Sequence, residues 1–340
     1  MTTPASGPES GGSNGLPAAD PVGARPGASF FTIEGRQAPA LFVVGWLGSL
    51  VGVGLIAVAI LARSGLASTA VLLTGLALLS IGLIAAAGSQ GIERRARAMA
   101  GYAGPSPLLV FGASIPASIL VLVVVALPLE ALGVALEGPL GSLLSVAVQA
   151  AVYIGLIRLL VVDTGALDWR AMGIRRLNLT ALAEMAGGAL WAVPIIALTI
   201  PISLVLLAIF PVTPESPLPP TGTASGFALS VLAGALVAPL GEEVLFRAFA
   251  TTAWVRSIGV RGGLVRAAVV FAFAHVLTIS GSSAGDAIGL AVVGFVTRLP
   301  IALALGLLFV RRGTIWSSFG LHAAFNLVLL VVAEVASRTI

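Results

Sequence analysis

Apolar stretches of about 20 residues, each long enough to cross a bilayer core as a helix, recur along this 340-residue chain. The chain is 58% hydrophobic and only 9% charged, whereas soluble domains carry roughly 25% charged residues. Inside a bilayer every backbone polar group must be satisfied internally, so we predict an all-α, polytopic transmembrane bundle. We expect nine spans, or eight if a short or interrupted one does not cross, over residues 40–62, 66–87, 107–127, 140–162, 185–210, 226–250, 264–280, 287–310 and 314–336.

The chain begins with a segment that has no apolar core. Residues 1–38 are rich in Gly, Pro, Ser and Ala, a composition typical of disorder. They lack the apolar region of a signal peptide, so we expect the first span to direct membrane insertion. We predict a disordered cytoplasmic tail over 1–38, followed by the first transmembrane spans over 39–139.

Arginines near the span ends alternate along the chain and predict the topology. Basic residues concentrate in cytoplasmic loops, and every second loop here is arginine-rich. This alternation predicts nine spans with the N-terminus in the cytoplasm. The arginines that mark the predicted cytoplasmic loops are Arg94, Arg95, Arg97, Arg170, Arg175, Arg176, Arg256, Arg261, Arg266, Arg311 and Arg312.

Two residue types are missing, and their absence limits the chemistry. There is no cysteine, which excludes disulfides, thiolate metal sites and a cysteine nucleophile. All 18 basic residues are arginine, which excludes a Ser–Lys dyad or a Schiff-base lysine. The formal charge of +4 reflects topology and does not indicate nucleic-acid binding. The arginine-, alanine- and glycine-rich composition is typical of a GC-rich bacterial genome, so we expect a bacterial plasma or inner membrane.

Four ionisable side chains lie inside apolar segments, where they are costly and therefore indicate function. They are the adjacent carboxylates Glu242 and Glu243 and the chain's two histidines, His275 and His322. Glu243, His275 and His322 lie 13, 9 and 10 residues from the nearest predicted cytosolic arginine. At 1.5 Å per residue these separations are roughly 20, 14 and 15 Å. Three spans thus place their ionisable groups at one depth, which predicts a single site reached from the cytosol.

The carboxylate pair lies four residues before an arginine. Glu243 and Arg247 share a helix face and can form a structural ion pair. Glu242 projects about 100° away, so it can face a water-filled cavity as a general base. Two carboxylates close together at low dielectric resist being ionised together. Alternatively, the pair simply ends a span at the interface.

The histidines have informative neighbours at helical spacing. Phe271 lies four residues before His275 and could wall its pocket. His322 and Asn326 are also four apart, so the imidazole and the amide point into one space, where they could donate to a developing oxyanion. Gly320 would allow a close approach of another helix or of substrate. Each histidine could instead serve only interhelical packing.

Arg298 lies in the middle of the predicted span 287–310. At 13 residues from Arg311 it would lie about 20 Å from the cytosolic boundary. Pairing with Asp286 or snorkelling outward would give it a structural role. Recognition of a substrate carboxylate is the sharper alternative.

The three motifs together resemble those of a known family. In order they are Glu242-Glu243-x-x-x-Arg247, Phe271-x-x-x-His275 and His322-x-x-x-Asn326. They resemble the motifs of the CPBP group, which comprises type II CAAX prenyl proteases and bacteriocin-processing or lysostaphin-resistance-protein-A-like membrane proteins. The resemblance covers roughly residues 140–336, the predicted protease core. The segments 167–176 and 313–316 agree with it.

The resemblance implies an intramembrane endopeptidase. In the family picture, the residue at Glu242 activates water for attack on the scissile carbonyl. Those at His275 and His322 hold that water or bind a metal, and Asn326 helps to stabilise the oxyanion. Glu243 and Arg247 are supporting positions.

The sequence is compatible with both a zinc-dependent and a metal-free mechanism. Glu242, His275 and His322 are enough for a catalytic zinc site with one open position. However, they do not form HExxH, in which both histidines lie on one helix face. In a metal-free mechanism Glu242 is the base, and the two histidines and Asn326 position water and substrate.

The expected partners are the lipid bilayer and a membrane-associated protein or peptide substrate. Two other classes of function remain. A proton-coupled transporter would also use embedded Glu and His, although its ionisable groups would form a path across the membrane. A non-catalytic membrane scaffold could retain the same motifs.

Overall fold

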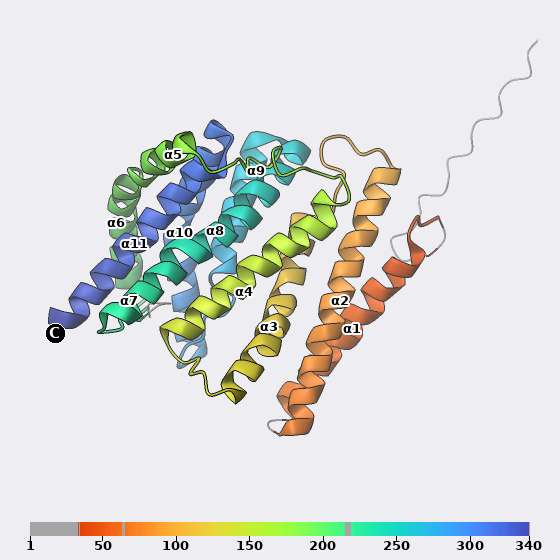
Figure 1. The fold of residues 1–340 in the computed structure, drawn as a ribbon, viewed down its shortest axis with the longest axis horizontal. Helices are drawn as coiled ribbons and strands as arrows, with labels where there is room; N and C mark the ends of the chain where they lie inside the picture. The colour runs from red at the N-terminus through yellow and green to blue at the C-terminus, as the bar shows by residue number, and fades with distance from the viewer. Residues whose placement is uncertain (1–32, 34, 63–64, 215–218, 340) are drawn as a thin grey trace, which may run out of the picture. The chain divides into compact units, whose positions relative to one another are not determined.

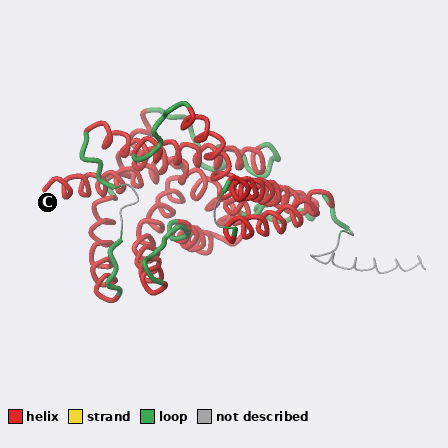
Figure 2. Tube along the Cα trace, turned by 90° about the horizontal axis from the view of Figure 1, so that it is seen from below, coloured by secondary structure: helices red, strands yellow, loops and turns green. Residues whose placement is uncertain are grey.

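The computed structural model describes residue 33 and residues 35–62, 65–214 and 219–339. Most of the predicted disordered tail, residues 1–38, lies outside the described residues. Residues 37–340 form one compact unit. All regular elements in the described part are helices (Figure 2), which confirms the predicted all-α bundle.

The first helices follow one another as neighbours. They are α1 (Pro39–Leu61), α2 (Leu66–Ala96), α3 (Pro107–Ala131) and α4 (Pro139–Ile157), which continues as the π-helical segment η1 (Arg158–Val162). α1 packs on α2, α2 on α3, and α3 on α4 (Figure 1). Proline stands at the first position of α1, α3 and α4, where its missing N–H has no helical partner to lose.

The second half of the chain contains the elements that bear the predicted site. They are α5 (Leu179–Ala189), α6 (Ala192–Ile209), α7 (Ala224–Val231), η2 (Leu232–Val237), α8 (Ala238–Glu242), η3 (Glu243–Thr251), α9 (Thr252–Ala274), α10 (Ala284–Arg312) and α11 (Ile315–Thr339). Asn178, Thr223 and Ser283 cap α5, α7 and α10 by accepting a backbone N–H two or three residues into each helix. In Figure 1, α4, the α7–α8 helix and α11 lie side by side, in agreement with their contacts.

The structure contains eight candidate membrane-spanning helices within the described residues, where nine spans are the main expectation from the sequence. The difference arises in one 51-residue helical stretch, Ala224–Ala274, which contains the predicted span 226–250 and the first part of the predicted span 264–280. Gly259 interrupts this stretch with φ 79° and ψ 169°, backbone that favours glycine. The arms on either side pack together, with Ala250 and Trp254 against Ala267. The chain therefore folds back at Gly259.

The buried core lies where five elements meet. Five large apolar side chains, one from each of α4, η3, α9, α10 and α11, are at most 2% exposed. They are Ile157, Phe249, Phe271, Leu305 and Leu321. Many large apolar side chains elsewhere are exposed. This is the distribution expected where lipid surrounds the helices, and the chain is an integral, multi-pass membrane protein.

Two glycines allow α5 to cross close to α11. A Cβ on Gly320 would overlap the carbonyl oxygen of Met185, and a Cβ on Gly188 would overlap that of Ser317. Small residues permit such backbone-to-backbone approach, as the sequence predicts for Gly320. Since Gly320 lies two residues before His322, this crossing also fixes the position of the histidine.

Gly320→Ala is therefore expected to destabilise the protein by about 1–3 kcal/mol, because the added methyl must push α5 and α11 apart. Thermal unfolding in detergent would measure the effect. Gly155→Ala in α4 is the matched control, since a Cβ there meets nothing within 4 Å. Equal melting temperatures for Gly320→Ala and the wild type would contradict a tight crossing.

Candidate active site

The three sequence motifs meet in the structure, although up to 80 residues separate them along the chain. Glu242 ends α8 and Glu243 begins η3, His275 follows the last residue of α9, and His322 lies in α11. The Glu243 side chain is 0% exposed and that of His322 is 5% exposed, whereas those of Glu242 and His275 are 16% and 27% exposed. The site thus has a closed side at Glu243 and an open side at His275.

Both histidines converge on one oxygen of Glu242. Glu242 Oε2 lies 3.6 Å from His275 Nε2 and 3.6 Å from His322 Nε2. These separations are too long for direct hydrogen bonds. In the described part of the chain, this buried oxygen has no hydrogen-bond partner.

The other nitrogen of each ring is held in place. His275 Nδ1 lies 2.8 Å from the carbonyl oxygen of Phe271. A carbonyl only accepts, so Nδ1 carries a proton, and in the neutral imidazole Nε2 presents a lone pair to Glu242. His322 Nδ1 lies 3.0 Å from Glu243 Oε1, and an ionised carboxylate fixes the same tautomer there. Three acceptor atoms therefore face one another and need a donor between them.

Glu243 and Arg247 form the buried support of the site. Arg247 Nε lies 3.6 Å from Glu243 Oε1, and the Arg247 side chain is only 2% exposed. The guanidinium carbon stacks 4.1 Å from the centre of the Phe271 ring, a cation–π contact. Phe271 also contacts both imidazoles, with ring centres 4.5 Å from His275 and 5.7 Å from His322. The predicted wall beside His275 therefore serves both histidines.

Two π-helical segments flank the carboxylates, η2 before α8 and η3 after it. Every residue of η3 is buried, and the Thr251 hydroxyl donates to the carbonyl of Phe246, five residues earlier. π-helical turns are rare and are frequent at functional sites. The carbonyl of Gly234, in η2, accepts a hydrogen bond from the side chain of Asn326.

The side-chain amide of Asn326 is hydrogen-bonded to a neighbouring helix, η2. Its Nδ2 donates to the carbonyl oxygen of Gly234 at 2.8 Å. Within the described region Asn326 makes no hydrogen bond to Glu242 or to either histidine, and its amide is bonded to η2. The amide nitrogen has two N–H donors, and only one is used in this bond.

The sequence interpretation missed one neighbour of Glu242. Tyr153, from α4, is 6% exposed and interacts electrostatically with Glu242. Tyrosine is as scarce as histidine here, with two in the whole chain. That scarcity could have pointed to it.

Arg298 does not have the partner considered for it. Asp286 Oδ2 instead accepts from the backbone N–H and the hydroxyl of Ser282 at the start of α10. Arg298 Nη1 donates to the carbonyl of Gly294 on its own helix at 2.9 Å. Arg298 interacts electrostatically with both Glu242 and His275, so it belongs to the surroundings of the site.

The predicted zinc ligands have suitable donor types, two imidazole nitrogens and one carboxylate oxygen. However, no group of three or more His, Asp or Glu side chains in the described ranges is arranged to hold a metal ion. Zinc binding stays a prediction, and the chemistry below uses the groups of the chain.

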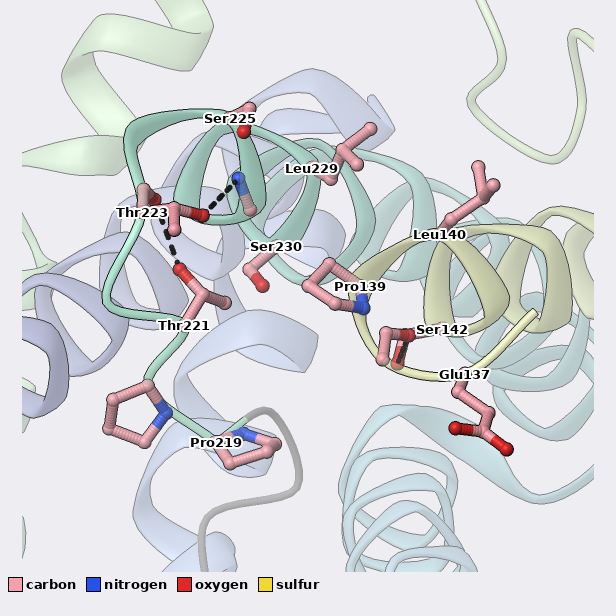
Figure 3. A pocket seen from close by; sticks show the side chains of 13 residues that line it. Glu137, Pro139, Leu140, Ser142, Pro219, Thr221, Thr223, Ser225, Leu229 and Ser230 are labelled. Carbon is pink, nitrogen blue, oxygen red and sulfur yellow. Dashed lines mark hydrogen bonds between the residues drawn. The ribbon is translucent and has the colours of Figure 1, made fainter. Parts of the chain in front are cut away.

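A separate pocket of about 430 Å³ lies away from this cluster. Residues 137–142 line one side and residues 219–230 the other, so it lies at the starts of α4 and α7 (Figure 3). The Thr223 hydroxyl there accepts the backbone N–H of Gly226, and the Thr221 hydroxyl donates to the Thr223 carbonyl. None of the predicted site residues lines this pocket, and the hydroxyls of Thr221 and Thr223 stabilise the turn before α7.

The subsidiary segments noted in the sequence also meet. The backbone N–H of Ile315 donates to the carbonyl of Gly173, and Trp316 Nε1 donates to the carbonyl of Arg175. These bonds join the loop after α4 to the start of α11. They hold the helix that bears His322.

Comparison with known families agrees with the motif assignment. Residues 224–328 match the family model described as type II CAAX prenyl endopeptidase Rce1-like. This range contains Glu242, Glu243, Arg247, His275, His322 and Asn326. No curated protein and no solved structure matches the chain. Residues 224–328 therefore form a domain of the type II CAAX prenyl endopeptidase Rce1-like family, a family of intramembrane proteases, as the sequence motifs indicate.

Proposed function

We propose that this protein is an intramembrane endopeptidase that hydrolyses a peptide bond of a membrane-associated protein or peptide, with Glu242 as the general base. The observation that carries the proposal is the convergence of His275 Nε2 and His322 Nε2 on Glu242 Oε2. A separation of 3.6 Å between Glu242 Oε2 and each Nε2 suits a water molecule that donates one O–H to the carboxylate and the other to an imidazole, at about 2.7–3.0 Å from each.

The proposed first step is attack by this water. Glu242 Oε2 takes one proton from the water as its oxygen bonds to the scissile carbonyl carbon, and the carbonyl oxygen becomes an oxyanion. The imidazole of His275 or His322 accepts a hydrogen bond from the other O–H of the water and so orients the nucleophile. The proton held on Glu242 then passes to the leaving amine as the C–N bond breaks. General-base assistance of this kind contributes typically 10²–10⁴-fold.

Glu243 and Arg247 keep the machinery in place without touching the substrate. Glu243 accepts from His322 Nδ1, which fixes the ring orientation and leaves Nε2 free. Arg247 neutralises Glu243 and stacks on Phe271. Because Glu243 is already paired, Glu242 is the carboxylate available for proton transfer.

Asn326 is the proposed oxyanion donor, through the N–H that is not bonded to Gly234. Asn326→Ala is expected to lower the cleavage rate by about 10²–10³-fold and to leave a measurable trace. The rate should be expressed per folded protein, since the lost bond to Gly234 also lowers stability. If the melting temperature falls while the rate per folded protein stays within tenfold, Asn326 has only a structural role.

The family description also suggests a first test substrate. A peptide with a farnesylated cysteine followed by three aliphatic residues belongs to the CAAX prenyl class named by the matched family. We propose that access to the site is from the cytosolic side of a bacterial plasma membrane.

Quantitative N-terminal profiling of host membranes tests the function directly. Membranes containing the wild type are compared with membranes containing Glu242→Gln at matched expression. New N-termini present only with the wild type would support proteolysis and identify the substrate. Glu130→Gln is the matched control, because Glu130 is an exposed carboxylate at the end of α3. Identical profiles with both proteins folded would favour a scaffold or a proton-coupled transporter.

A further inference from the structure

Arg298 is a cation in the middle of a spanning helix, and no ion-pair partner is recorded for it in the part of the chain that the structure describes. It lies 14 residues from either end of α10 and is half-buried. Its recorded hydrogen bond goes to the carbonyl of Gly294. A mid-membrane guanidinium is costly, and one carbonyl satisfies only a fraction of its five N–H donors.

The surroundings of Arg298 place its guanidinium near the end of α9. A Cβ on Gly294 would lie 3.2 Å from Arg298 Nη1 and 3.2 Å from Val276 Cγ1. Val276 directly follows His275 in the chain. Glycine at position 294 thus leaves room for the guanidinium against the end of α9.

The nearby carboxylates have other partners, so the Arg298 guanidinium can bind a carboxylate from outside the chain. Glu243 is paired with Arg247 and His322, Asp286 is bonded to Ser282, and Glu242 faces the two histidines. Arg298 attracts Glu242 from a distance without pairing with it. A guanidinium presents a planar fork that matches a carboxylate with two parallel hydrogen bonds.

We infer that Arg298 binds a carboxylate of the substrate, so that the site selects peptides that carry a negative charge close to the cleaved bond. This inference rests on the proposed function, because it assigns the residue to substrate binding at the same site. The carboxylate could be the free C-terminus of the peptide or an acidic side chain. Either would supply the ion-pair partner that Arg298 lacks within the chain.

The test separates binding from cleavage. The protein carries Glu242→Gln, and the probes are three fluorescent forms of the farnesylated test peptide. One form has a free C-terminal carboxylate, one a C-terminal amide, and one the amide with an aspartate as its last residue. Binding is measured by fluorescence anisotropy with the full chain in lipid nanodiscs.

With Arg298 present, the free acid is expected to bind about 10- to 100-fold more tightly than the amide, the range of a charged hydrogen-bonded pair. In Arg298→Gln the acid and the amide should bind alike, and Arg298→Lys should keep part of the preference. Recovery of affinity by the aspartate form shows that a side-chain carboxylate suffices, whereas no recovery assigns recognition to the terminus. Arg312→Gln, at the exposed end of the same helix, is the control and should keep the full preference.

Equal binding of acid and amide to the Arg298-containing protein would overturn the inference, and so would a preference that survives Arg298→Gln. Failure to bind any of the three peptides would count against it as well. The proposed function fails separately, if the protein with Glu242 intact binds the acid selectively but cleaves no peptide bond. Melting temperatures of each variant ensure that loss of preference is not loss of folding.

Discussion

Glu242→Gln is expected to reduce the rate of peptide cleavage by about 10²–10⁴-fold, the range of general-base catalysis. Glutamine keeps the size and one acceptor oxygen of the side chain but does not take the proton from water. The measurement is the rate of cleavage of the farnesylated test peptide by purified protein in nanodiscs. Glu130→Gln should cleave at the wild-type rate.

We also expect Glu242→Gln to keep the thermal stability of the wild type. Glu242 Oε2 is buried without a hydrogen-bond partner in the described structure and faces two Nε2 lone pairs. The amide of glutamine could donate to one of them, so the melting temperature should not fall. A rate within tenfold of the wild type would show that Glu242 is not the base. Glu242→Asp shortens the side chain by one methylene. Its cleavage rate should be about 10²-fold lower than that of the wild type, as expected when a catalytic group is displaced by about 1 Å.

Arg247→Ala is expected to destabilise the folded protein by about 3–5 kcal/mol, because it leaves a buried carboxylate without its cation. Glu243 is fully buried and Arg247 nearly so, so water cannot replace the lost charge. The loss also removes the cation–π contact with Phe271. Unfolding of purified protein in mixed detergent micelles measures the change in free energy.

A double-variant cycle separates the ion pair from simple loss of packing. Replacing both partners, with Glu243→Gln and Arg247→Met, should cost less than the sum of the two single changes, since no buried charge is left alone. Arg261→Ala is the control, because Arg261 is exposed and should change stability by less than about 0.5 kcal/mol. Additive costs in the cycle would contradict a coupled pair.

The ionisable residues of the site could be found from the sequence because the bilayer makes them conspicuous. Glu242, His275 and His322 lie in apolar segments, where ionisable residues stand out. A count of residues from the flanking arginines placed His275, His322 and Glu243, the neighbour of Glu242, at one depth. The structure brings the three segments together, with Glu242 within 3.6 Å of both histidines. The four-residue spacing also correctly predicted the pairing of Glu243 with Arg247.

Other features depend on backbone geometry that a count of residues does not contain. The π-helical segments η2 and η3 have the same apolar composition as α-helix, so the bond between Asn326 and Gly234 could not be foreseen. The fold-back at Gly259 lies in the loop expected between the predicted spans 226–250 and 264–280, but the sequence does not show that the helix continues up to this single non-helical residue. For Arg298 the sequence leaves pairing with Asp286, snorkelling and recognition of a substrate carboxylate open, because distance along one helix does not show that its neighbours come from the end of α9.

The fold-back at Gly259 has a consequence for how the protein sits in lipid. The returning arm, residues 260–274, is about 22 Å long, shorter than the roughly 30 Å of a hydrocarbon core. An arm of this length that begins at one surface ends about 8 Å before the other edge of the core, and the segment that follows it, from His275 to Ser283, is non-helical. Irregular backbone is tolerated inside a membrane only where protein buries it or water reaches it. Hydrolysis consumes one water per bond, and His275, whose side chain is 27% exposed where α9 ends, is the more accessible of the two histidines.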